Sequence, residues 1–154
     1  MVIFLFLFFK SEIAVATPSF MFRKEYLDSV GLFNEAKPFA DIDFFLRLAK
    51  QVNGVILYEP LFFRRLHDAN VSSLEWEKGS REGLELLRSY KKILPPGITR
   101  NAFFKQHINF GEKYLNIKQP RKAITHFINS WKQKPFNIIP LKKAGKAILF
   151  FFKK

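Results

Sequence analysis

The stretch FADIDFFLRLAK places two aspartates and an arginine where they could do chemistry. Asp41 and Asp43 spell the DxD pattern of a metal-binding carboxylate pair. A carboxylate here could instead act as a general base, and the third possibility is an ordinary charged helix start. The apolar residues that follow recur at helical spacing, which predicts a helix over 41–51 with both carboxylates in its first turn. Asp43 and Arg47, four apart, can then form a surface ion pair.

The segments around this helix predict a mixed α/β domain over residues 1–72. Gly31 suits the end of a short helix over residues 24–30. Three segments rich in β-branched and aromatic residues are predicted to be strands, namely 13–23, 54–60 and 61–67. Because these strands have no obvious partners, the fold class expected is an α/β fragment with a partial sheet.

Composition limits the remaining possibilities. The 154 residues include 20 phenylalanines and are 48% hydrophobic, so a packed core is expected. Cysteine is absent, which excludes disulfides and thiolate metal sites. The opening run MVIFLFLFF is shorter than the roughly 20 residues of a membrane span. It also lacks the positive start of a signal peptide, so a buried helix or strand is expected.

From residue 73 onward the pattern is helical, and prolines divide it. Helices are predicted over 74–93, 99–116, 120–133 and 138–152. Residues 104–137 resemble a tetratricopeptide repeat. The matching positions are Phe110, Gly111, Tyr114, Ala123, Phe127 and Pro135. His107 stands where that repeat usually has a tryptophan, and a single repeat cannot bury both of its faces.

The charge of the chain is unevenly divided. Net charge is +13, and residues 1–70 contain eight basic and eight acidic residues. Residues 71–154 contain eighteen basic and five acidic residues, and Glu112 is the only acid after Leu86. This asymmetry predicts an anionic partner such as membrane headgroups, a phosphorylated substrate or nucleic acid, with a merely solvated basic surface as the alternative. Nucleic acid is the least favoured, because no zinc, helix-turn-helix or RNP motif is present.

The final stretch combines lysines with large apolar residues. PLKKAGKAILFFFKK suits a helix over about 138–152 that lies in the interface of an anionic bilayer. A helix docked on the core, with a lysine-rich outer face, is the alternative.

Residues 17–73 resemble the C-terminal half of the catalytic domain of family 2 glycosyltransferases, which have the GT-A fold. Four motifs in order carry the resemblance: S-x-x-x-R, VG-x-F-(D/N)-E, the acidic helix start ED-x-D-x-x-x-R, and Y-x-P-L with a following arginine, histidine and serine. They fall at 19–23, 30–35, 40–47 and 58–72.

The resemblance implies transfer of a sugar from a nucleotide-sugar donor to a glycan or lipid-linked acceptor. Asp41 would be the general base that takes the acceptor's proton. Arg64, Arg65 and Asp43 would lie near the donor diphosphate, and His67 would bind a divalent metal, Mg or Mn. For Asp41 a helix cap is the alternative, and for His67 a loop histidine without a ligand.

Two features depart from that family. Ala40 stands where the first carboxylate of the acidic pair is expected. The family's nucleotide-binding half precedes the matched segment, and this chain has no room for it. We therefore expect little activity from this chain alone, as a fragment of a transferase gene, a truncated product or one part of a split enzyme. In the last case, an N-terminal half encoded upstream would be its partner. The expected location is the cytoplasm, at the inner face of the membrane.

A second function of another class competes with the first. Residues 73–154 could act as a basic helical binding module, without catalysis, for a protein partner, a membrane surface or nucleic acid.

Overall fold

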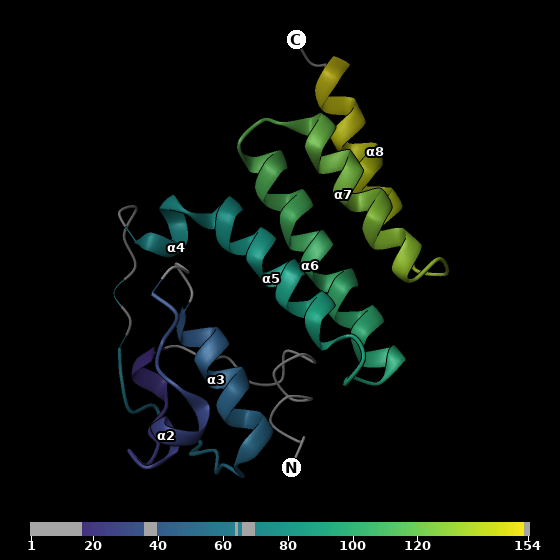
Figure 1. Cartoon of the computed structure of the whole chain (residues 1–154). Helices are drawn as coiled ribbons and strands as arrows, with labels where there is room; N and C mark the ends of the chain where they lie inside the picture. The colour runs from purple at the N-terminus through teal and green to yellow at the C-terminus, as the bar shows by residue number, and fades with distance from the viewer. Residues whose placement is uncertain (1–16, 36–39, 64, 66–69, 153–154) are drawn as a thin grey trace. The chain divides into compact units, whose positions relative to one another are not determined.

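The structure of the chain, a computed structural model, describes residues 17–35, 40–63, 65 and 70–152 (Figure 1). Every regular element in these residues is a helix. The chain divides into two compact units, residues 1–79 and 80–154, which are treated separately below.

The expected partial sheet is wrong for the described residues, none of which forms a strand. Thr17–Ser19 forms the 3-10 turn η1, and residues 53–63 have no helix or strand. β-Branched and aromatic residues favour a strand only where a pleated, half-buried surface and a hydrogen-bonding partner exist. No such partner lies among the described residues, and Pro60 removes one backbone donor from the second candidate. The fold class is therefore helical, and not α/β.

The first unit is built around α3 (Ala40–Gln51). The short helix α2 (Tyr26–Val30) packs against it, and α4 (Val71–Leu74) follows later in the chain. Phe44 is fully buried and forms the centre of the core with Val30 and Leu48. The partly buried side chains around them are Phe20, Phe22, Tyr26, Leu27 and Val52. The apolar stripe predicted on helix 41–51 is thus the core of this unit.

The helix α5 (Trp76–Tyr90) begins in the first unit and continues into the second. Three further helices complete the second unit: α6 (Pro96–Asn116), α7 (Pro120–Gln133) and α8 (Ile139–Phe152). Both α6 and α7 begin with proline, which suits the first helical position because no backbone donor is needed there. In Figure 1, α6 and α7 run side by side and α8 lies against α7.

Close approach between α6 and α7 depends on Gly111. A Cβ atom at this position would overlap the ring of Phe127, which is fully buried. Ala123 is also fully buried, so the two helices meet over small residues with aromatic rings between them. Ser130 adds a polar contact, since its Oγ donates to the carbonyl of Phe104 at 3.0 Å.

Candidate functional site

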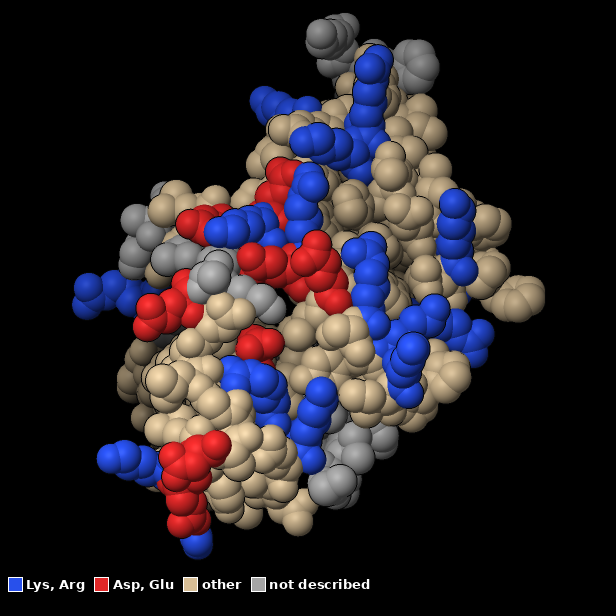
Figure 2. Space-filling model, viewed as in Figure 1, with Lys and Arg blue, Asp and Glu red and all other residues tan. Residues whose placement is uncertain are grey.

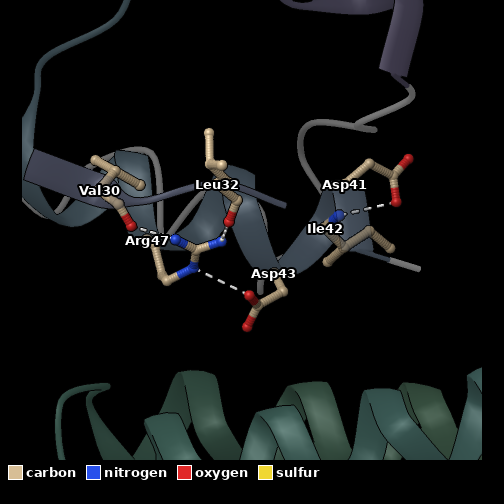
Figure 3. Close-up of polar contacts among 6 residues, drawn as sticks. All are labelled: Val30, Leu32, Asp41, Ile42, Asp43 and Arg47. Atoms are coloured by element: carbon tan, nitrogen blue, oxygen red, sulfur yellow. Dashed lines mark hydrogen bonds and ion pairs between the residues drawn. The ribbon is translucent and has the colours of Figure 1, made fainter. Parts of the chain in front are cut away.

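The start of α3 holds Asp41 in a fixed, half-buried position. Its Oδ1 accepts a hydrogen bond from the backbone N–H of Ile42 at 2.9 Å (Figure 3). Its Oδ2 accepts from the Thr17 hydroxyl at 2.7 Å. Both oxygens of the carboxylate therefore have a donor within the first unit, as expected for a carboxylate at a helix N-terminus.

Asp43 and Arg47 do form the ion pair predicted from their spacing, with Arg47 Nε 3.0 Å from Asp43 Oδ2. The guanidinium group has two further acceptors. It donates from Nη1 to the carbonyl of Val30 and from Nη2 to that of Leu32 at 2.7 Å (Figure 3). These carbonyls flank Gly31, whose φ of +79° belongs to the region that favours glycine. Arg47 thus fastens the end of α2 to α3.

This Arg47 contact is a structural device that satisfies carbonyls left open where α2 ends. A fork of donors matches two carbonyls and a carboxylate at once, which lysine could not do. Sequence spacing revealed only the local ion pair, because Val30 and Leu32 are 17 and 15 residues from Arg47.

Of the other predicted site residues, only Arg65 belongs to the part of the chain that the structure describes. Arg65 is exposed in an irregular segment, where its carbonyl accepts from Asn70 at 3.4 Å. Arg64 and His67 lie outside the described residues. In the part of the chain that is described, no group of three or more His, Asp or Glu side chains could hold a metal ion.

The second unit contains a polar contact that sequence analysis missed. His107 on α6 and His126 on α7 lie with their Nδ1 atoms 3.0 Å apart, so one ring donates to the other. The ring of Phe110 stacks on His126, with 4.3 Å between the centroids. Burial, the neighbouring His126 and the charge of Arg88 lower the pKa of His107 to about 4, so this ring is neutral at pH 7. The only sequence signal was that His107 replaces a large aromatic residue of the helical repeat.

The helix α8 has an unusual division between its buried and exposed sides. It packs against α7, and its buried side chains are the small ones, Pro140, Ala144 and Ala147. A second stripe at positions i, i+7 and i+8 contains Leu141, Ile148 and Leu149, and all three are exposed. This outward stripe is called the α8 apolar face below.

Lysines border the α8 apolar face. Lys142 and Lys146 are both exposed; Lys142 lies about 100° around the helix from Leu141, and Lys146 lies about 60° from Leu149, on the same side of the stripe. Lys143 instead forms an ion pair with Glu112 of α6, which helps to hold α8 in its orientation. Figure 2 shows Lys and Arg side chains over α7 and α8 on the face in view. No described helix is both long and apolar enough to cross a membrane.

Comparison with known proteins gives no relative of this chain: no family model, no curated protein and no solved structure matches it. The resemblance to family 2 glycosyltransferases is therefore corrected, because no family model supports it and the described residues contain no GT-A sheet. Each motif was short, and short motifs recur by chance when they are not tied to a fold. The roles that the resemblance implied for Asp41, Asp43, Arg64, Arg65 and His67, and for Mg or Mn, lose that support.

Proposed function

We propose that residues 80–154 form a basic helical module that binds the surface of an anionic lipid membrane, with α8 lying along the interface. The observation that carries this proposal is that α8 buries small side chains and exposes large apolar ones. Its small side chains are buried, while Leu141, Ile148 and Leu149 are exposed next to the exposed lysines Lys142 and Lys146. Helices that lie in the headgroup region combine an apolar face with flanking lysines in this way.

The apolar contribution can be estimated from the exposed side chains. Ile148 is 45% exposed and Leu149 62% exposed. Moving that remaining surface out of water stabilises binding by roughly 1 kcal/mol per side chain. Each lysine near an anionic surface adds about 1 kcal/mol. Several such contributions together suffice for reversible peripheral binding.

Charge favours a membrane over other anionic partners. Residues 113–154 contain eleven Lys and Arg residues and no Asp or Glu, so nothing in this segment repels an anionic surface. A nucleic-acid backbone would be bound by the cations alone and would leave the α8 apolar face in water. A bilayer can bind both the lysines and the α8 apolar face, because its headgroups attract lysines and its acyl chains accept apolar side chains.

The test is sedimentation of the full chain with vesicles. We expect binding to vesicles of phosphatidylcholine with phosphatidylglycerol, little binding to phosphatidylcholine alone, and weaker binding as salt screens the lysines. Ile148→Ser with Leu149→Ser should weaken partitioning by about thirtyfold, because two apolar contacts of roughly 1 kcal/mol each are lost.

Ile93→Ser is the matched control, since Ile93 is 46% exposed in the same unit but belongs to the segment between α5 and α6. It should change partitioning by less than about twofold. Equal losses in both variants, or an unaltered affinity after the α8 substitutions, would overturn the proposal. So would a stable dimer that the α8 substitutions dissociate, because the apolar face would then belong to a second copy.

A further inference from the structure

We propose that Phe136, in the loop between α7 and α8, is an aromatic anchor that inserts into the bilayer when α8 lies on it. This inference rests on the proposed function and adds a second insertion point to it. Phe136 is 101% exposed, so the ring makes no lasting contact within the chain. The whole apolar surface of this ring is therefore available for burial against a partner.

The loop that carries Phe136 is held by hydrogen bonds on both sides of the ring. The Trp131 indole N–H donates to the carbonyl of Pro135 at 2.8 Å, and the N–H of Asn137 donates to the carbonyl of Lys134 at 3.0 Å. The Asn137 side chain accepts from the N–H of Ile139 at 3.0 Å, at the start of α8. Exposure of the ring is thus imposed by an ordered backbone. Because the loop is already ordered, insertion of the ring loses little conformational entropy.

The lysine closest to the ring in sequence is directed to another partner. Lys134 donates from Nζ to Asn101 Oδ1 at 2.6 Å and lies 5.1 Å from the centre of the Phe104 ring. Its charge is therefore held against α6. Lys132, on α7 and four residues before Phe136, is exposed and can attract anionic headgroups.

The exposed apolar side chains continue from this loop into α8. Ile138 and Ile139 are both about half exposed, and Leu141 begins the α8 apolar face. Because Phe136 and the α8 apolar face are linked by exposed apolar residues, and no acid lies nearby in the sequence, the bilayer favoured for α8 is also the partner favoured for Phe136. Phenylalanine, with Trp and Leu, is typical of the apolar face of helices that lie in the membrane interface.

The experiment uses the full chain with Trp76→Phe, which leaves Trp131 as its only tryptophan. Trp131 reports on the loop because its indole N–H donates a hydrogen bond to the carbonyl of Pro135. Vesicles contain phosphatidylcholine and phosphatidylglycerol with bromine on the acyl chains. We expect quenching of Trp131 fluorescence on binding. Phe136→Ser should weaken partitioning by about tenfold and remove most of that quenching. Phe136→Trp should restore partitioning, with a blue-shifted emission.

Phe63→Ser is the matched control, because Phe63 is also 101% exposed but belongs to the first unit. It should alter partitioning by less than about twofold. If Phe136→Ser binds like the parent while the α8 substitutions abolish binding, the anchor is overturned and the proposed function stands. If Phe63→Ser weakens binding equally, the anchor is also overturned. If the parent does not bind anionic vesicles, both proposals fail.

Discussion

The helices α3 and α8 divide their side chains in opposite ways. On α3 the large residues Phe44 and Leu48 face the core, and its polar residues form bonds at its edge. On α8 alanines are buried and the larger Leu141 and Ile148 are exposed. Both helices are amphipathic in sequence, so the difference shows that an apolar stripe indicates a contact without saying whether the partner is the chain's own core.

The two units also differ in their content of charged residues. Residues 1–79 contain nine basic and ten acidic residues, whereas residues 80–154 contain seventeen basic and three acidic residues. In the first unit Arg47 is used internally, to fasten α2 to α3. In the second unit the basic residues greatly outnumber the acids, so most cannot be paired within the unit. The first unit uses its charges to stabilise its fold, and the second displays them.

The largest effect should come from removing the ring at the centre of the α3 core. Phe44→Ala should lower the free energy of unfolding by about 3–5 kcal/mol, because it leaves a cavity in a fully buried site. Leu149→Ala on the exposed side of α8 should change it by less than about 0.5 kcal/mol. Urea unfolding followed by circular dichroism measures both. Similar losses in the two variants would show that the Leu149 side chain is buried in the core.

A smaller effect is expected from the Arg47 contact. Arg47→Met keeps the apolar stem but removes the donors to Val30 and Leu32, and should cost about 2 kcal/mol of unfolding free energy. Arg47→Lys should recover only part of it, because an ammonium group lacks the planar fork.

Lys142→Met is the matched control for Arg47→Met, because it removes an exposed charge of the second unit. It should leave the free energy of unfolding unchanged and weaken binding to anionic vesicles. If Arg47→Met were neutral and Lys142→Met destabilising, the contrast between internal and displayed charge would be wrong.

The smallest effect concerns the histidine pair, which joins α6 to α7 as Arg47 joins α2 to α3. The pKa of His107 is lowered to about 4 from its ordinary 6.5, so the unfolded chain binds the proton more readily. Stability is therefore full above pH 6.5 and falls as pH decreases toward 4. A modest loss is expected, since the pair is only half buried.

His107→Gln should flatten this part of the stability profile, which thermal unfolding at a series of pH values measures. An unaltered slope in the His107 variant would mean that the acid sensitivity arises elsewhere.

The helices could be predicted from local signals. Residues 41–51 and 120–133 were expected to be helical, and the structure has Ala40–Gln51 and Pro120–Gln133. Proline and glycine mark these boundaries, and their effects act within a single turn. The predicted strands are wrong for the described residues, because a strand requires a partner that a one-dimensional pattern does not reveal.

The candidate site was predicted only where its parts are close in sequence. The Asp43–Arg47 pair and the lysine-rich apolar segment over 138–152 are both local patterns. The carbonyl acceptors of Arg47 and the partner of His107, which is 19 residues away, are contacts between elements. The short motifs that resembled a transferase carry no information on whether a sheet connects them.

By itself, the sequence determined the distribution of charge, the helical segments and the lysine-rich apolar segment over 138–152, because these are properties of composition and local spacing. Only the tertiary structure decided which apolar residues of that segment are buried. Small residues allow two helix backbones to approach closely and gain more dispersion contacts, so α8 packs through Ala144 and Ala147. Its larger side chains are therefore left on the surface, where the proposed membrane contact would cover them.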